Sequence, residues 1–320
     1  MHDTLARRSI HFLSKAGIIA FAHKTALVLL NRINRWNHRK RSENDQRIYD
    51  EKMEKLPSDA NHVQAPVLDF RMKLRLDDKG LSRDLIIHGI REKDATGYLR
   101  PLLRDRRTII EIGANQGYYA IMEAVDSPPG ARIHAFEPHP ENVDTLKMNI
   151  QLNSCADKFA TVEQVAISCV DGIANLYIHD LSNWHSLADV GLQGGWRGVM
   201  QVPTLSLDTY CKNNTISHID FVRMDVEGHE IEVVKGGCDI LQRSEDCLIF
   251  MELHTRQLRQ MGHSGEELLR ILASLGFNYI TVCGKGKFLK SQSPDYVIKM
   301  LELVTEKYGH HFFISKRKLN

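Results

Sequence analysis

The feature that most constrains the fold is the stretch 108–138, where two apolar segments flank a two-glycine turn and an amphipathic run. The first segment and its turn read T-I-I-E-I-G-A-N-Q-G-Y-Y, and the second segment reads I-H-A-F-E-P. A strand, a glycine turn, a helix and a second strand ending in a carboxylate form a βαβ unit that binds a nucleotide at the turn. The sequence therefore predicts an α/β fold with a nucleotide site after the first strand.

Apolar strand patterns and helical patterns alternate through the rest of the chain. Ser264 and Glu267 form a capping box before an apolar helical run, and Gly276 follows as a stop signal. This alternation predicts a Rossmann-like parallel sheet with helices on both faces. We expect seven strands, near residues 108–113, 132–137, 160–167, 219–225, 247–253, 278–283 and 311–315.

The charge distribution divides the chain. Residues 1–48 hold ten Lys and Arg against three Asp and Glu, although the whole chain holds 42 against 40. We therefore predict a basic, partly amphipathic helical extension at 1–48, a linker with a lead-in strand and helix at 49–105, and a nucleotide-binding domain at 106–320. Any contact with a polyanion or an anionic membrane is expected from the extension.

The apolar run 16–30 in the extension is about fifteen residues long and is interrupted by His23 and Lys24, whereas a membrane span needs about twenty. It fits either an interfacial helix or a helix that packs on the body or on a second subunit. The six scattered cysteines indicate a reducing compartment, without disulfides or a structural metal. We expect a cytoplasmic protein, for which the extension offers a peripheral contact at the inner membrane face.

The turn itself indicates which nucleotide fits. A dinucleotide site needs G-x-G-x-x-G, in which the second glycine lets the backbone approach a pyrophosphate. Here Asn115 takes the place of that glycine, between Gly113 and Gly117, and no Lys-Ser/Thr pair follows for a phosphate loop. This disfavours NAD, and a ligand with adenosine but no phosphate fits better.

S-adenosylmethionine is such a ligand. Glu137, 24 positions after Gly113, ends the second strand, where a ribose diol would find a carboxylate. Glu111 is an acid inside an apolar strand, where burial costs several kcal/mol unless the group is paired. It could hold the ammonium of the methionine moiety. The alternative is an ordinary tight turn with a solvated carboxylate at the strand end.

A second constellation ends the predicted strand at 219–225. The segment reads M-D-V-E-G-H-E, so Asp225, Glu227, His229 and Glu230 fall within six residues. Ligands of open α/β sheets bind beyond the carboxyl ends of the strands near the switch point, so this segment should face the reacting group. One or both of Glu227 and Glu230 could instead cap the following helix.

Methyl transfer to a hydroxyl needs in-line alignment and removal of a proton. Asp225 and His229 are the preferred candidates for the base, Glu227 is the third catalytic candidate, and Glu252 and His254 at the end of the next strand stand behind them. Asp225 could instead hold the cofactor amine or a divalent cation. Two carboxylates at this spacing leave Mg²⁺ an open alternative.

Five motifs in order resemble the FkbM family of S-adenosylmethionine-dependent methyltransferases. They are I-E-I-G-A-N-Q-G-Y-Y, F-E-P-H-P-E-N, L-K-M-N-I-Q-L-N, V-P-T-L-S-L-D and M-D-V-E-G-H-E-I-E-V-V-K-G-G, within residues 70–316. The resemblance implies a class I methyltransferase fold and O-methylation of a sugar, glycolipid, polyketide or other secondary metabolite. It also implies that residues 225–230 line the reaction centre, and that the cofactor is bound by Glu111, Gly113, Asn115, Gly117 and Glu137, with the segment from Ala166 to Ser168 beside the adenine.

Two segments depart from the family pattern, namely 93–98 and the tryptophan-bounded insert 184–196. Both are expected to shape the acceptor site. The main hypothesis is an O-methyltransferase acting on a small molecule or glycan. The alternatives are an RNA or protein methyltransferase that uses the basic extension, and a non-catalytic module that binds the cofactor. No nucleic-acid partner is expected, because the body is acidic and no aromatic platform for bases accompanies the basic run.

Overall fold

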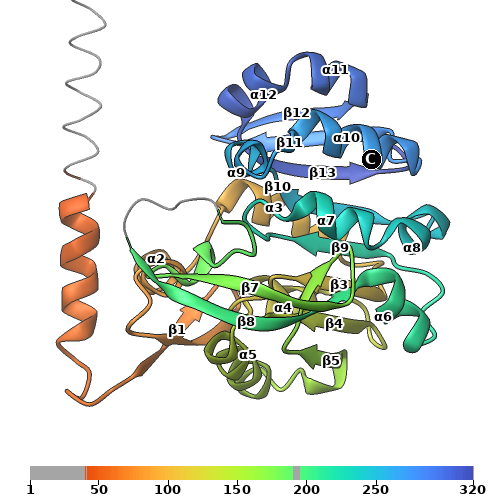
Figure 1. The fold of residues 1–320 in the computed structure, drawn as a ribbon. Helices are drawn as coiled ribbons and strands as arrows, with labels where there is room; N and C mark the ends of the chain where they lie inside the picture. Colours follow the sequence, from red (N-terminus) through yellow and green to blue (C-terminus); the bar gives the residue numbers. More distant parts are fainter. Residues whose placement is uncertain (1–39, 41, 190–194, 320) are drawn as a thin grey trace, which may run out of the picture. The chain divides into compact units, whose positions relative to one another are not determined.

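A computed structural model of the chain describes residues 40, 42–189 and 195–319 (Figure 1). The chain divides into two compact units, Met1–Ser58 and Asp59–Asn320. In the described part of the first unit, residues 42–53 are helical. The predicted interfacial segment at 16–30 lies outside the described residues. None of the helices in the described ranges has the length and apolar character needed to cross a membrane.

The second unit is built on an eight-stranded sheet with the order β12-β11-β13-β10-β9-β3-β4-β5. From one edge to the other these are Lys287–Gln292, Tyr279–Gly284, His311–Ser315, Leu248–Glu252, Phe221–Met224, Thr108–Ile112, Arg132–Phe136 and Phe159–Glu163. The strands β10, β9, β3, β4 and β5 are parallel, and β13 lies antiparallel between β10 and β11. The predicted class I methyltransferase sheet is therefore confirmed.

Two details of the sheet differ from the prediction. The eighth strand, β12, was missed because K-F-L-K-S-Q carries few apolar residues and lies at the exposed edge. The predicted strand at 160–167 is two strands, β5 and β6 (Ala166–Ser168). β6 leaves the main sheet and joins a three-stranded sheet of order β6-β8-β7, with β7 at Gly172–His179 and β8 at Trp196–Ser206.

Helices cover both faces of the main sheet (Figure 1). One face carries α3 (Lys93–Leu102), α4 (Tyr118–Asp126) and α5 (Pro140–Leu152). The other face carries α6 (Leu207–Asn213), α7 (Glu230–Lys235), α8 (Cys238–Arg243) and α10 (Gly265–Ser274). The remaining helices are α2 (Leu81–His88), α9 (Thr255–Gln260), α11 (Pro294–Lys299) and α12 (Leu301–Tyr308), with 3₁₀ turns η1 (Ala156–Lys158) and η2 (Ser182–Trp184).

The predicted N-terminal signal of α10 is confirmed. Ser264 Oγ accepts a hydrogen bond of 3.0 Å from the backbone N–H of Glu267, and Gly276 follows the helix with a φ of +94°. Such a cap is worth about 1 kcal/mol. The stretch between β12 and β13 holds the two short helices α11 and α12.

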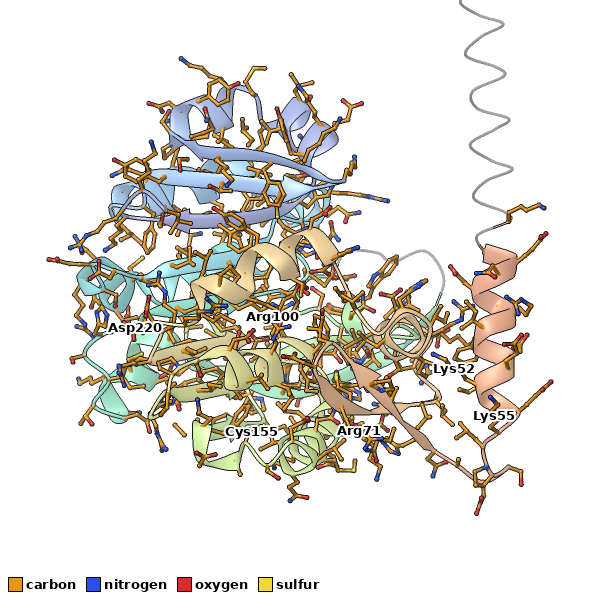
Figure 2. The ribbon with its side chains drawn as sticks, turned by 180° about the vertical axis from the view of Figure 1, so that it is seen from behind. Lys52, Lys55, Arg71, Arg100, Cys155 and Asp220 are labelled. Atoms are coloured by element: carbon orange, nitrogen blue, oxygen red, sulfur yellow. The ribbon has the colours of Figure 1, made fainter. Side chains whose placement is uncertain are left out.

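The lead-in segment 59–105 belongs to the same compact unit as the sheet. It contains a hairpin of β1 (His62–Val67) and β2 (Phe70–Arg75), and the turn of this hairpin is tied to α3 and α4. Arg100 on α3 donates to Asp126 at the end of α4, at 2.7 and 2.8 Å, and to Asp69 in the turn at 2.8 Å (Figure 2). These bonds fix α3 against the sheet domain.

The amino ends of β3 and β9 are aligned by one carboxylate. Asp220 Oδ2 accepts hydrogen bonds from the backbone N–H groups of Arg107 and Thr108, at 2.9 and 2.8 Å (Figure 2). The register that follows pairs Ile112 with Met224 at the other end of the two strands. The carboxyl ends of the two central strands therefore reach the same edge of the sheet, where the sequence places its functional residues.

Two glycines allow the packing of α7 to be tested. A Cβ on Gly236, at the end of α7, would lie 2.0 Å from the Ser168 carbonyl oxygen of β6, whereas a Cβ on Gly97 in α3 would meet no atom within 4 Å. We expect Gly236→Ala to lower the free energy of unfolding by about 1–3 kcal/mol or more. The matched Gly97→Ala should raise it by up to about 1 kcal/mol. Urea denaturation measures both, and equal effects would contradict this packing.

Candidate active site

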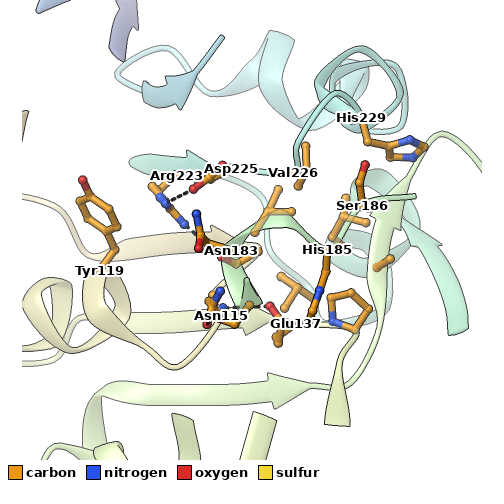
Figure 3. Close-up of a pocket in the computed structure, with 18 of the residues that line it drawn as sticks. Asn115, Tyr119, Glu137, Asn183, His185, Ser186, Arg223, Asp225, Val226 and His229 are labelled. Carbon is orange, nitrogen blue, oxygen red and sulfur yellow. Dashed lines mark hydrogen bonds and ion pairs between the residues drawn. The ribbon is translucent and has the colours of Figure 1, made fainter. Parts of the chain in front are cut away.

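A pocket opens at the carboxyl ends of β3, β4 and β9 (Figure 3). Its floor is formed by the turn after β3, which includes Gly113 and Asn115, and by Glu137 after β4. Val165, Ala166 and Ile167 close one side with apolar side chains. An apolar wall beside a carboxylate suits a ligand that joins a flat ring to polar groups.

The turn after β3 keeps the conformation that its glycines predict. Gly113 has a φ of +78°, and a Cβ there would lie 2.3 Å from the Asp225 carbonyl oxygen. Asn115 also has a positive φ, of 49°, which is several-fold more acceptable for Asn than for most residues. Gly117, with a φ of +97°, precedes α4, and a Cβ there would meet the side chain of Leu146. The turn therefore lies close to the end of β9 and to α5.

Glu137 is buried at the pocket floor, and its carboxylate is hydrogen-bonded to the turn after β3. Its Oε2 accepts from the backbone N–H of Asn115 at 2.9 Å, and its Oε1 accepts from the N–H of His139 at 2.9 Å and from Asn142 Nδ2 at 3.3 Å. Burial raises the pKa of Glu137, which these hydrogen bonds partly oppose. Each carboxylate oxygen has two lone pairs, and three of the four are used, so Oε2 keeps capacity for one hydroxyl of a ligand.

Arg223 on β9 connects the two central strands. Its Nη1 donates to Glu111 Oε1 at 2.9 Å and to the Gly113 carbonyl at 3.0 Å, and its Nη2 donates to Asp225 Oδ2 at 2.9 Å. The guanidinium also stacks 4.3 Å from the centroid of the Tyr119 ring. Burying such a pair is costly unless its hydrogen bonds are satisfied. Here the sheet holds one cation between two carboxylates.

Glu111 is fully buried below the pocket and does not line it. Its carboxylate bonds Arg223, which lines the pocket, and burial raises the pKa of Glu111 to about 7. Burial also raises the pKa of Glu123 on α4, and the nearby Glu111 adds to this effect. The sequence predicted that Glu111 holds the ammonium of the methionine moiety, but the structure pairs it with Arg223, and Glu111 reaches the pocket only through this partner.

The second constellation separates into two parts. Asp225 and His229 line the pocket, on either side of Val226, and the ring of His229 points away from the group of Arg223 and Asp225 (Figure 3). His229 Nε2 lies 3.0 Å from the hydroxyl of Ser168, and burial lowers the pKa of His229. Glu227 faces His254 instead, with Oε2 3.3 Å from Nε2 of that ring.

Of the residues predicted for the site, Gly113, Asn115, Glu137, Ala166, Asp225 and His229 line the pocket, whereas Glu111, Gly117, Ser168 and Glu227 do not. Each of these four contacts a lining residue or shapes the turn. Gly117 begins α4, and Ser168 and Glu111 hold His229 and Arg223. They belong to the support of the pocket.

The segment that covers the pocket includes the start of the insert 184–196, which was expected to shape the acceptor site. Ser182, Asn183, His185 and Ser186, between β7 and β8, line the pocket from the side opposite the sheet (Figure 3). The segment is anchored by Asp78, which is 4% exposed and accepts from the backbone N–H and the hydroxyl of Ser182 at 3.0 and 2.9 Å. Asp78 also accepts from Gln116 Nε2 at 2.8 Å, in the turn after β3. Residues more than one hundred positions apart therefore form one buried network.

Comparison with known proteins identifies the family. Residues 111–279 match the family described as the methyltransferase FkbM domain. The chain belongs to this family. It is 24% identical over 163 residues to the hexuronic acid methyltransferase AglP of Haloferax volcanii, covering 51% of this chain and 62% of that protein. It is 26% identical over 182 residues to the 2-O-methyltransferase NoeI of Sinorhizobium fredii, covering 52% and 70%.

Solved structures of methyltransferases align with part of the chain. The FkbM methyltransferase of Methylobacillus flagellatus aligns with a TM-score of 0.39 at 15% identity, over 66% of this chain and 44% of that one. An O-methyltransferase from Bacillus cereus, solved in complex with SAH, aligns with a TM-score of 0.38 at 13% identity, over 69% and 77%.

A buried histidine in the segment that covers the pocket predicts that the stability of the protein falls at acid pH. Burial lowers the pKa of His185 to about 3, and its ring centroid lies 4.6 Å from that of His139, whose pKa burial also lowers. An unfolded His185 takes up a proton near pH 6.5 and the folded one does not. Stability should therefore be lost from about pH 6.5 down to pH 3, by up to about 1.4 kcal/mol per pH unit.

Urea unfolding at pH 7, 6, 5 and 4 tests this expectation. His185→Asn keeps an acceptor for the His179 N–H, which His185 Nδ1 accepts at 3.1 Å, and should make the loss of stability with falling pH less steep. The control is His88→Asn, at an exposed histidine, which should leave the slope of stability against pH unchanged. Identical slopes in the native protein and in His185→Asn would contradict the prediction.

Proposed function

We propose that this chain binds S-adenosylmethionine in the pocket and transfers its methyl group to a hydroxyl of a sugar or of a sugar-containing molecule. The observation that carries the proposal is the carboxylate of Glu137 at the end of β4, above a turn whose second glycine position holds Asn115. This arrangement suits a ribose diol and leaves no glycine cradle for a pyrophosphate. Membership of the FkbM family supports the methyl donor.

The pocket offers a place for each part of the cofactor. Glu137 would bind the ribose, and the apolar side chains of Val165 and Ile167 would cover the adenine. The methionine end would lie over the turn after β3, towards Arg91 and Asp225. Arg91 is a cation whose Nε already bonds Glu92 at 2.6 Å, so it is oriented before a carboxylate arrives. The acceptor would then approach from the side of Asp225.

The name of AglP, a hexuronic acid methyltransferase, supports a sugar as acceptor, and the name of NoeI, a 2-O-methyltransferase, supports transfer to an oxygen. The insert between β7 and β8 covers the pocket and would contact such an acceptor. Contacts of the basic extension 1–48 with a membrane or a partner stay a prediction.

Cofactor binding is tested by calorimetry with S-adenosylmethionine, S-adenosylhomocysteine and NAD. We expect the first two to bind and Glu137→Ala to weaken both by about tenfold to a hundredfold, because a hydrogen bond to a charged group is worth about 1.5–3 kcal/mol. Asp144→Ala, at an exposed carboxylate of α5, is the matched control and should bind like the native chain. Binding of NAD alone, or full affinity in Glu137→Ala, would overturn the assignment.

The two candidate bases make different predictions. Asp225 lies beside Arg223 at the methyl-donor end, whereas His229 turns towards Ser168. We expect Asp225→Asn to lower kcat by about 10²-fold or more, and His229→Gln by less than about tenfold. Circular dichroism checks that both variants fold. A larger loss in His229→Gln than in Asp225→Asn would place the reaction on the other side of Val226.

A further inference from the structure

Beside the pocket, at the carboxyl ends of β9 and β10, lies a group of side chains that cofactor binding does not use. Asp225, Glu227 and His254 each offer one ligand atom, and these atoms lie within 4.8 Å of one another. We propose that these three side chains bind a first-row divalent cation of the Mn²⁺ or Zn²⁺ type, next to the methyl-transfer pocket. The catalytic part of this inference rests on the proposed function, whereas the binding part does not.

The orientation of His254 is the first argument. Its Nδ1 lies 2.8 Å from Glu230 Oε1, and Glu230 is fully buried and also accepts from the backbone N–H of Gly228 at 3.1 Å. The ring therefore directs Nε2 towards Glu227 at 3.3 Å and Glu252 at 3.8 Å. Histidines that bind metals almost always donate their second N–H to a carboxylate in this way.

The unused capacity of the carboxylates is the second argument. Asp225 Oδ2 accepts a hydrogen bond from Arg223, while the buried Oδ1 of Asp225 has no hydrogen-bond partner among the described residues. The buried Oε2 of Glu230 likewise has none within that part of the chain. Buried oxygens of this kind are costly unless a donor or a cation satisfies them.

The backbone at Glu227 is the third argument. Glu227 has a φ of 51°, in the left-handed region that an L side chain rarely adopts. Such a conformation costs about 1–3 kcal/mol and clusters at sites that clamp a ligand. Here it turns the Glu227 side chain from the pocket towards His254, where Gln257 Nε2 donates to its Oε2 at 3.2 Å.

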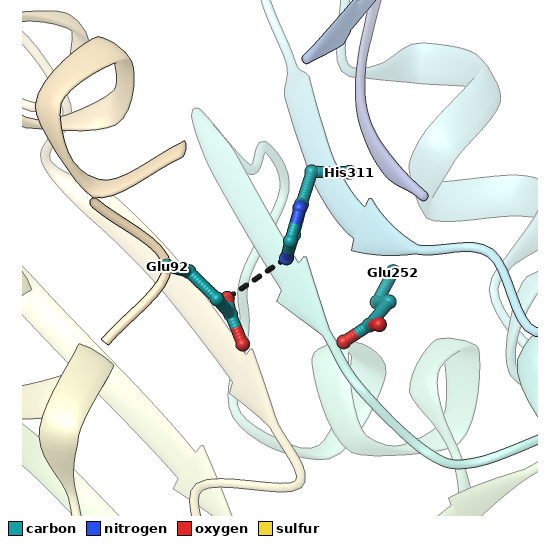
Figure 4. A group of neighbouring side chains, drawn as sticks. All are labelled: Glu92, Glu252 and His311. Carbon is teal, nitrogen blue, oxygen red and sulfur yellow. Dashed lines mark ion pairs between the residues drawn. The ribbon is translucent and has the colours of Figure 1, made fainter. Parts of the chain in front are cut away.

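A neighbouring group, Glu92, Glu252 and His311, also has ligand atoms within 4.8 Å of one another (Figure 4). Its central carboxylate is already occupied. Glu92 accepts from Arg91 and from the Tyr119 hydroxyl, and His311 Nε2 lies 3.0 Å from its Oε2. A cation there would have to displace all of these partners of Glu92, whereas the group around His254 includes Asp225 Oδ1, which has no hydrogen-bond partner among the described residues, so it is the better site.

The donor set selects the class of cation. Mg²⁺ prefers oxygen ligands alone, whereas one imidazole with two carboxylates suits Mn²⁺ or Zn²⁺. Three protein ligands leave coordination positions open, as catalytic sites require. The spacing of the carboxylates in the sequence left Mg²⁺ as an alternative. The donor set, which includes an imidazole, favours a softer cation over Mg²⁺.

The location gives the cation a role in methyl transfer. A bound cation lowers the pKa of a hydroxyl beside it. The hydroxyl oxygen forms the bond to the methyl carbon, and the carbon–sulfur bond of the sulfonium breaks with its electron pair passing to sulfur. In this arrangement Asp225 holds the cation instead of acting as the base, so the hydroxyl proton passes to water, and the products are a methyl ether and S-adenosylhomocysteine.

The test uses the full chain, stripped with a chelator and titrated with Mn²⁺ while electron paramagnetic resonance follows the signal of the free aquo ion. We expect one Mn²⁺ to bind per chain. His254→Gln should weaken binding by at least tenfold, and Glu230→Gln, which removes the carboxylate behind the imidazole, by about 10- to 100-fold. His263→Gln, at a partly exposed histidine between α9 and α10, is the matched control and should bind Mn²⁺ like the native chain.

Binding of S-adenosylhomocysteine and circular dichroism are measured on the same samples. If S-adenosylhomocysteine binds but neither Mn²⁺ nor Zn²⁺ binds at up to about 1 mM, the metal site is overturned and the proposed function stands. Equal Mn²⁺ affinity in His254→Gln would also overturn the site. If Mn²⁺ binds with the expected variant pattern and S-adenosylhomocysteine does not, the metal site stands and the cofactor assignment fails.

Discussion

The site depends on the two buried ion pairs that Arg223 forms with Glu111 and Asp225. They join β3 to β9 at the point where the order of the parallel strands reverses, which is where open α/β sheets bind their ligands. Because the guanidinium also donates to the Gly113 carbonyl, the position of the turn is coupled to the position of Asp225. Removing one partner of such a pair typically costs about 3–5 kcal/mol, since it leaves a charge buried without compensation.

Much of the fold followed from local patterns. Buried parallel strands such as β3, β9 and β10 are mostly apolar, and the glycine turn and the Ser264 cap have strong chemical signatures. β12 could not be found this way, because an exposed edge strand is held by backbone hydrogen bonds to β11 and carries little hydrophobic pattern. The division of residues 160–167 into β5 and β6 depends on tertiary pairing with β8, which is remote in sequence.

Site residues could be predicted from the sequence only where a single local motif sets both the backbone turn and the spacing of the functional side chains. Gly113, Asn115 and Glu137 belong to one βαβ unit, and their spacing alone brings them together. Asp78 lies in an unremarkable turn, and its contact with Ser182 spans 104 positions. Glu111 and its partner Arg223 are 112 positions apart in the chain. The sequence therefore did not indicate whether the Glu111 carboxylate contacts a ligand or another side chain.

The second sheet has a consequence for how such a chain can diversify. β6, β7 and β8 form a sheet of their own, although β6 also lines the pocket with Ala166, so the segment that covers the pocket is attached to a sheet whose pairing does not involve β3, β4 and β9. Its length and side chains can change while the pairing of β3, β4 and β9 stays intact. Substitutions in this segment could therefore change the acceptor of the proposed methyl transfer without altering the strands of the main sheet.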